Sequence, residues 1–173
     1  EGLFTVVDDP VVKSDLQGQL AESYFGQNRF VDAKKEYLKA IATGKPHNNQ
    51  YLIFNFCLRL YEKKVYLDMA QGLVDELIEK NGTNFDLLLL KGDIFFVKEQ
   101  FLEAKKIYKS LLQAMNNQIE DQKVRSQVNE RLGDSFAKLK NIKDALLYWR
   151  EAASIGPGSD LLEKKILNEE YME

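Results

Sequence analysis

The chain has 173 residues, with 45% hydrophobic and 29% charged residues and a formal net charge of −3. This length suits one domain, and the slight negative charge argues against nucleic acid as a partner, because phosphate binding needs clustered lysine and arginine. With only one cysteine, Cys57, and one histidine, His47, an internal disulfide, a histidine-based metal site and an ordinary Ser-His-Asp triad are excluded. No apolar run approaches the roughly 18 residues of a membrane helix, so no direct membrane span is expected.

The first 13 residues predict the tail of a preceding helix. Leu3, Phe4, Val6 and Val7 are apolar, and Pro10 is expected to end that helix because proline cannot continue one. The chain begins at Glu1 rather than methionine, and we therefore expect it to be a processed product or part of a longer protein.

Four alanines recur at intervals of 37, 34 and 41 residues. Each is followed four residues later by a bulky apolar side chain and preceded nine residues earlier by an aromatic one. Small residues or a leucine stand twelve residues before. This spacing predicts four helix–turn–helix units, 14–47, 51–84, 85–118 and 126–159, which must stack to bury their apolar sides. The recurring residues are Ala33, Ala70, Ala104 and Ala145; Tyr37, Val74, Tyr108 and Trp149; Tyr24, Tyr61, Phe95 and Phe136; and Ala21, Leu58, Gly92 and Gly133.

These residues resemble the tetratricopeptide repeat (TPR) family. The fourth unit matches best, the first nearly as well, the third has Lys91 where the family has leucine, and the second is degenerate. The resemblance implies an all-α fold, a right-handed α–α superhelix (TPR solenoid) of about four repeats. The matched residues of the fourth unit are Leu132, Gly133, Phe136, Ile142, Ala145, Trp149, Ala152 and Pro157.

The last residues, 160–173, predict a capping helix. Asp160 and Glu163 have the spacing of a capping box, and the helix is expected to run towards Tyr171 with Lys164, Lys165, Glu169 and Glu170 on its outer side. Extra residues at 116–125 are expected to lengthen the neighbouring helices or the turn between them.

The residues that could carry chemistry are predicted to have structural rather than catalytic roles. His47 is expected to be an exposed turn residue, and Cys57 a buried, inert thiol. Asn81 and Gly82 predict a helix end, although with Thr83 they also match a glycosylation sequon. No zinc-ligand spacing, phosphate-binding loop or nucleophile motif is present, so we expect no enzyme activity, cofactor or metal.

The TPR resemblance further implies that the first helix of each unit lines a concave groove. Six acids and two phenylalanines at those positions predict a non-catalytic module that binds a protein or peptide with lysine or arginine among apolar residues. This lining departs from the Lys/Asn/Arg carboxylate clamp of some TPR cochaperones. The predicted groove residues are Asp15, Glu22, Phe25, Arg59, Asp86, Asp93, Phe96, Glu130 and Asp134.

Two alternatives stay open. The groove positions are either a binding surface or merely hydrated and covered by repeats outside this segment. The alternative function is an all-α hydrolase or ligand-sensing domain that uses groove carboxylates. A looser resemblance to bacterial TPR proteins, including cell-envelope lipoproteins, suggests the periplasm or cell envelope, with the cytoplasm as the alternative location.

Overall fold

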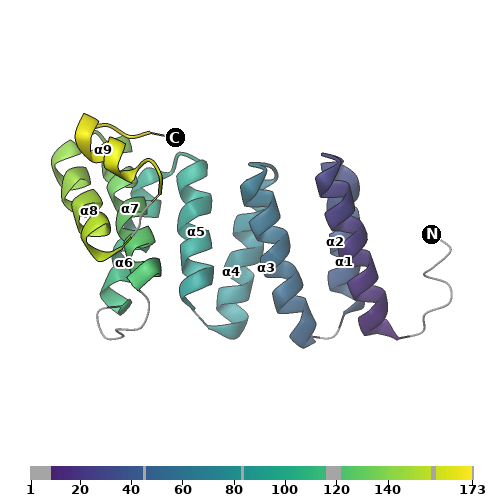
Figure 1. Cartoon of the computed structure of the whole chain (residues 1–173). Helices are drawn as coiled ribbons and strands as arrows, with labels where there is room; N and C mark the ends of the chain where they lie inside the picture. The colour runs from purple at the N-terminus through teal and green to yellow at the C-terminus, as the bar shows by residue number, and fades with distance from the viewer. Residues whose placement is uncertain (1–8, 45, 83, 116–121, 157–158, 173) are drawn as a thin grey trace. The chain divides into compact units, whose positions relative to one another are not determined.

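The computed structural model describes residues 9–44, 46–82, 84–115, 122–156 and 159–172, and only the backbone of residues 46–49. More than two-thirds of the described residues are helical and none forms a strand, which confirms an all-α fold (Figure 1). The helices are α1 (Pro10–Gly26), α2 (Phe30–Thr43), α3 (Pro46–Glu62), α4 (Leu67–Asn81), α5 (Phe85–Val97), α6 (Phe101–Met115), α7 (Gln122–Lys138), α8 (Ile142–Ile155) and α9 (Leu162–Asn168).

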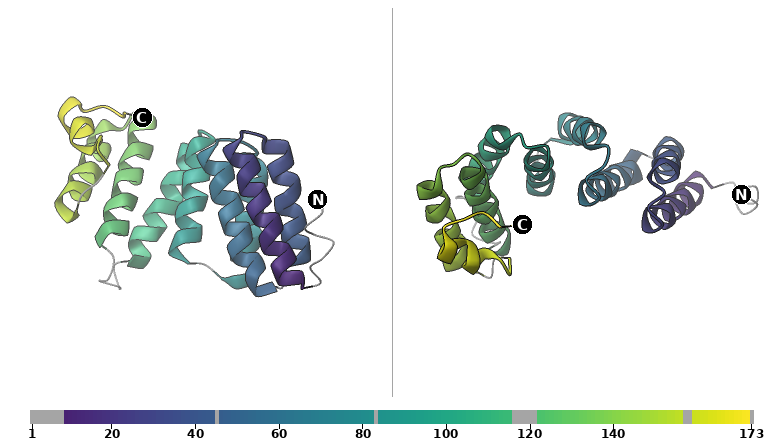
Figure 2. Two further views of the ribbon diagram at one scale, coloured as in Figure 1. Left: turned by 45° about the vertical axis from the view of Figure 1, so that its right-hand side comes forward. Right: turned by 90° about the horizontal axis from the view of Figure 1, so that it is seen from above.

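The chain divides into two compact units. Unit 1 (Glu1–Gly82) contains α1–α4, and unit 2 (Thr83–Glu173) contains α5–α9. Within each unit the helices pack as consecutive pairs, α1 with α2, α3 with α4, α5 with α6 and α7 with α8, and α9 packs on α8 (Figure 2). The four pairs correspond to the four units predicted from the alanine spacing.

The same tight turn closes every helix pair. A non-glycine residue with a left-handed backbone stands at the matching place in each turn, and the residue after it donates a backbone hydrogen bond to a carbonyl five residues earlier. Three of the pairs place that carbonyl on the predicted aromatic position, Tyr24, Phe95 or Phe136. The turn residues are Asn28, Lys64, Glu99 and Lys140.

Small residues on the first helix of a pair make room for large ones on the second. A Cβ added to Gly92 would lie 2.5 Å from the Tyr108 ring, and one added to Gly133 would lie 2.4 Å from Trp149. The degenerate second pair has Leu58 and Val74 at these places, so the larger residue is on its first helix and the smaller one on its second. Because a packed core leaves little free volume, the two positions must change together.

Two predicted boundaries differ from the structure. The first helix of the first unit begins at Pro10 rather than at residue 14; proline suits this place because its missing amide proton costs nothing there, and the Asp9 carboxylate accepts a hydrogen bond from the Val11 amide at 2.9 Å. The preceding helix predicted for residues 1–8 lies outside the described residues. His47 lies in the first turn of α3 rather than in the turn before it.

Other local predictions are confirmed. The thiol of Cys57 is fully buried, and burial raises its pKa to about 12. The helix α4 ends at Asn81, and Gly82 follows with φ of 78°, a backbone conformation that favours glycine. Of the extra segment between the third and fourth units, residues 116–121 lie outside the described residues, and Gln122–Arg125 lengthen α7.

Candidate partner-binding surfaces

The predicted groove residues fall into two groups. Asp15 and Asp86 are exposed, Phe96 is half-buried, and the side chains of Glu22 and Arg59 are 39% and 43% exposed. The other four are buried: Phe25, Asp93, Glu130 and Asp134. The expectation that Asp93 and Asp134 lie on a solvated face is therefore wrong.

Phe25 is a core residue rather than a platform for a partner. Its ring centroid lies 5.7 Å from that of Phe30, 5.9 Å from Tyr37 and 6.5 Å from Phe56. The ring centroid of Phe96 lies 5.2 Å from that of Phe101 and 5.9 Å from that of Tyr171. Both predicted aromatic platforms thus have partners within the chain.

A repeated hydrogen bond explains the buried acids. In three helix pairs, an acid on the first helix accepts a hydrogen bond from an aromatic side chain 15 residues later on the second helix. Tyr37 donates to Glu22, Tyr108 Oη donates to Asp93 Oδ1 at 2.6 Å, and Trp149 Nε1 donates to Asp134 Oδ1 at 2.9 Å. Burial, followed by the bond to Glu22, raises the pKa of the Tyr37 phenol far above its ordinary value.

Each of these acids also pairs with a cation from a later helix. Arg59 Nε lies 2.9 Å from Glu22 Oε2, Arg131 Nε lies 3.1 Å from Asp93 Oδ1, and Lys165 Nζ lies 2.9 Å from Asp134 Oδ1. We call these groups the first acid cluster (Glu22, Tyr37, Arg59), the second (Asp93, Tyr108, Arg131) and the third (Asp134, Trp149, Lys165). They tie each helix pair to the element that follows it.

The second helix pair departs from this pattern in both positions at once. It has Arg59 where the others have an acid and Val74 where the others have a hydrogen-bonding aromatic. Arg59 then supplies the cation of the first acid cluster and also pairs with Glu62 at 2.8 Å. The fifteen-residue spacing was visible in the sequence, and it is the signal that could have found these clusters.

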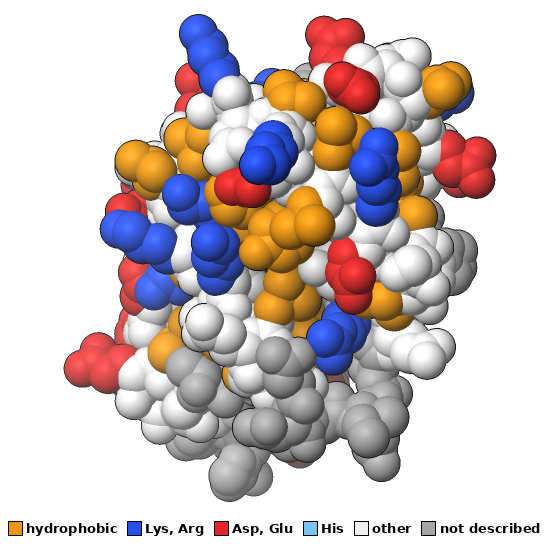
Figure 3. All heavy atoms as spheres, turned by 90° about the vertical axis from the view of Figure 1, so that its left-hand side faces the viewer, with side chains coloured by type: hydrophobic (Ala, Val, Ile, Leu, Met, Phe, Trp, Pro, Cys, Tyr) orange, Lys and Arg blue, Asp and Glu red, His pale blue; other side chains and the backbone are white. Residues whose placement is uncertain are grey.

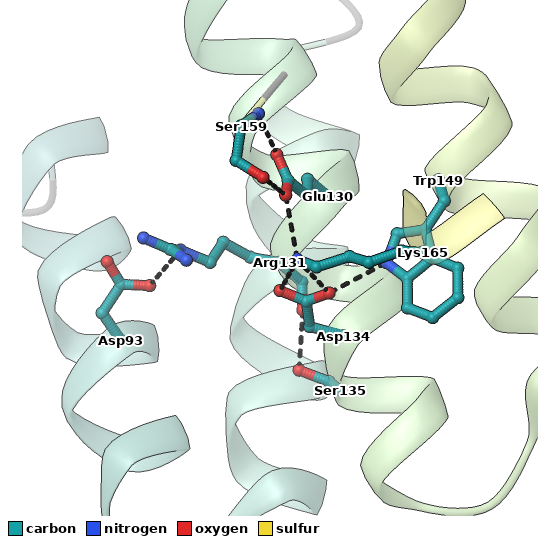
Figure 4. Close-up of polar contacts among 8 residues, drawn as sticks. All are labelled: Asp93, Glu130, Arg131, Asp134, Ser135, Trp149, Ser159 and Lys165. Carbon is teal, nitrogen blue, oxygen red and sulfur yellow. Dashed lines mark hydrogen bonds and ion pairs between the residues drawn. The ribbon is translucent and has the colours of Figure 1, made fainter. Parts of the chain in front are cut away.

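The third acid cluster is buried beneath the C-terminal segment (Figure 4). Lys165 Nζ lies 2.9 Å from both Glu130 Oε1 and Asp134 Oδ1, and the three side chains are at most 6% exposed. The Ser159 amide and hydroxyl both donate to the Glu130 carboxylate. The prediction that Lys165 lies on the outer side of the last helix is therefore wrong, because its ammonium group is buried and pairs with both carboxylates.

The two carboxylates respond differently to burial. For Asp134, burial outweighs the attraction of Lys165 and the bond from Trp149, and its pKa is raised. Burial also acts on Glu130, but the hydrogen bonds from Ser159 and Lys165 outweigh it, and the pKa of Glu130 is lowered. Hydrogen bonds and ion pairs from Ser159, Trp149 and Lys165 engage both carboxylates, which suits a structural role.

The helix α9 is shorter than predicted. It begins at Leu162, where Leu161 provides no side-chain cap, and it ends at Asn168, so the expected capping box and the extension to Tyr171 are wrong. Tyr171 nevertheless contacts the unit through its ring, with Lys138 Nζ 4.0 Å from the ring centroid.

An open hollow lies between α1 and α3 in unit 1. It has a volume of about 490 Å³, and two of the predicted groove residues, Asp15 and Glu22, line it, together with Tyr51, which is 71% exposed. We call it the α1–α3 hollow. Its lining residues are Asp15, Gly18, Gln19, Glu22, Tyr37, Tyr51, Leu52 and Asn55.

Other features of the described residues bear on the classes of site considered above. They hold no group of three or more His, Cys, Asp or Glu side chains placed to bind a metal ion. In the same residues, every helix is too short or too polar to cross a membrane. A scan of the chain against protein-family models finds no match, and a search among curated proteins finds none either.

Proposed function

We propose that the chain is a non-catalytic, TPR-like protein-interaction module whose α1–α3 hollow binds a segment of a partner protein. The observation that carries the proposal is the hollow itself, because it lies between the first helices of two successive pairs and two predicted groove residues, Asp15 and Glu22, line it. Four helix pairs with the same turn support the TPR-like interpretation, as do the two pairs in which a glycine of the first helix makes room for a large ring of the second.

The composition of this hollow favours binding over catalysis. Its polar groups are the amides of Gln19 and Asn55, the phenols of Tyr37 and Tyr51, the exposed carboxylate of Asp15, and the carboxylate of Glu22, which pairs with Arg59. The paired carboxylates that a hydrolase would need are Glu130 and Asp134, and both are engaged with Lys165. Such carboxylates hold a structure together and leave no acid or base directed at a substrate.

The partner proposed for the hollow is a peptide segment with an apolar or aromatic side chain beside a lysine or arginine. Tyr51 and Leu52 offer apolar surface, and Asp15 offers a solvated charge. The cationic preference rests on fewer acids than the sequence predicted, since Glu22, Asp93, Glu130 and Asp134 pair within the chain. We therefore expect contact with Tyr51 to contribute more to affinity than charge does.

The test uses two variants of matched exposure. Peptides are selected from a random displayed library on the intact chain, synthesised with a fluorescent label, and titrated by fluorescence anisotropy. Tyr51→Ala should weaken binding by about tenfold or more, because a large aromatic contact is lost. Val31→Ala removes a side chain that is 70% exposed on α2, outside the hollow, and should leave the affinity within about twofold. Equal binding by both variants would contradict the proposal.

A further inference from the structure

A second hollow lies between α6 and α8 in unit 2, and α7 contributes to its lining. Its volume is about 430 Å³, which is within the range of sites that hold one or a few side chains. We call it the α6–α8 hollow. Its lining residues are Lys109, Leu112, Gln113, Arg125, Asn129, Leu132, Leu147, Tyr148 and Glu151.

Two lysines of α6 gather at one aromatic ring beside this hollow. Lys105 Nζ and Lys109 Nζ lie 5.3 Å and 5.1 Å from the ring centroid of Phe136. That ring stacks on Tyr148, with a centroid distance of 5.4 Å and an angle of 6° between the planes. The ring attracts both ammonium groups, so two like charges are held close to the rim of an open hollow.

The charge balance of the hollow differs from that of the chain. Lys109 lines it and Lys105 stands beside it, whereas Glu151 is the one carboxylate among its lining residues. The chain as a whole carries a formal net charge of −3. A local excess of positive charge on an acidic protein attracts an anionic group to this place.

The uncharged part of the lining combines the amides of Gln113 and Asn129 with apolar side chains. Leu112, Leu132 and Tyr148 contribute to it, and Leu147 is 62% exposed. Figure 3 views the molecule from the side on which α8 lies in Figure 1, and it shows apolar side chains with lysine and arginine side chains, and some acidic ones, around them. Apolar surface next to clustered cations fits a ligand that combines a carboxylate with a hydrophobic group.

We propose that the α6–α8 hollow binds an acidic peptide segment in which an aspartate or glutamate stands next to a large aliphatic side chain. The carboxylate is placed at Lys105 and Lys109, and the aliphatic side chain packs on Leu112 and Leu147. This is a separate surface from the α1–α3 hollow, and its preferred charge is opposite. The two hollows therefore give the chain two binding surfaces with distinct partners.

The experiment uses a fluorescein-labelled peptide of alternating aspartate and leucine, titrated against the full chain by anisotropy. Lys109→Glu should weaken binding by about tenfold or more, because it replaces attraction by repulsion at the rim. Lys106→Glu is the matched control, since Lys106 is another exposed lysine of α6 and pairs with Glu103 at 2.8 Å outside the hollow. It makes the same change in net charge and should alter the affinity by less than about twofold.

The apolar half of the proposal has its own test. Leu147→Ser should weaken the same peptide by about threefold to tenfold, because Leu147 is exposed and its loss removes contact area without opening the core. A peptide with serine in place of leucine should bind as weakly to the native chain as the leucine peptide binds to this variant.

Three results would overturn the proposal. The first is equal weakening by Lys109→Glu and Lys106→Glu, which would indicate a nonspecific charge effect. The second is a preference for a lysine–leucine peptide over the aspartate–leucine peptide. The third is no binding of the aspartate–leucine peptide to a native chain whose circular dichroism is that of a folded helical protein. None of these results bears on the α1–α3 hollow, which has its own variants.

Discussion

The first and third acid clusters contain the same kinds of groups in very different surroundings. In unit 1 the side chains of Glu22 and Arg59 are 39% and 43% exposed, and they border an open hollow. In unit 2 the side chains of Asp134 and Lys165 are 3% and 4% exposed beneath the C-terminal segment. The repeated sequence pattern supplies the acid and its aromatic donor, and the next element decides whether that acid faces water.

This difference shows why an acid at a groove position is weak evidence for a cationic partner. A later helix of the same chain supplies a cation to each cluster, from α3, α7 or α9. The helix α9 therefore supplies the cation of the third acid cluster, as α3 and α7, each the first helix of a pair, do for the first and second clusters. A short C-terminal helix with one well-placed lysine completes unit 2 at the place where the pattern would call for a further pair.

The largest expected effect is a difference in the free energy of unfolding between variants of the third and the first acid clusters. Lys165→Met should destabilise unit 2 by about 3–5 kcal/mol, because it leaves two buried carboxylates without their cation. Arg59→Met should cost about 1 kcal/mol or less, since that ion pair is exposed and water screens it. Trp149 is the one tryptophan of the chain and lies in unit 2, so urea unfolding followed by its fluorescence reports on that unit.

The unit 1 variant needs a different probe. Cys57 is the one cysteine of the chain and lies buried in unit 1, so the urea dependence of its reaction with a thiol reagent reports on that unit. A pKa of about 12 makes the buried thiol slow to react until the unit opens. Similar losses for Lys165→Met and Arg59→Met would mean that burial does not distinguish the clusters.

The next effect concerns the close approach of α7 to α8. Gly133→Ala should destabilise unit 2 by about 1–3 kcal/mol, because the new Cβ would lie 2.4 Å from a Trp149 side chain with no exposed surface. The displaced indole would also strain its bond to Asp134, so the tryptophan emission of the folded variant should change. Gly72→Ala is the control in unit 1, followed through the urea dependence of the Cys57 reaction, since nothing lies within 4 Å of its added Cβ.

The spacing of small, aromatic and alanine positions predicted the helix pairs and their core because those residues face their own neighbouring helix. The position of Lys165 could not be predicted in this way. The Lys164–Lys165 pair looks like solvated helix surface, and only the long-range contact with Glu130 and Asp134 brings one lysine inside. Pro10 was ambiguous for a related reason, since proline both ends and begins helices.

Acid should affect the two carboxylates of unit 2 in opposite directions. The lowered pKa of Glu130 contributes stability that is complete above its ordinary pKa of about 4.3 and is lost as the pH falls through the lowered value. The raised pKa of Asp134 acts in reverse, since its ionisation in the folded state costs stability as the pH rises. Glu130→Gln should therefore flatten the loss of stability below about pH 4.3, as tested by urea titrations with tryptophan fluorescence at several pH values. An unchanged acid dependence would contradict the role given to Glu130.

The smallest expected effect tests whether a side chain that borders the α1–α3 hollow has room to move. Gly18→Ala places a Cβ 3.3 Å from Leu52 Cδ2, a flexible side chain that borders the hollow and has room to move. The gain in helix propensity, up to about 1 kcal/mol, should then prevail, and unit 1 should become slightly more stable. The measurement is the urea midpoint for the reaction of Cys57. A loss of stability similar to that of Gly133→Ala would mean that Leu52 is held as rigidly as Trp149, and it would remove the contrast between the α1–α3 hollow and the tight α7–α8 contact.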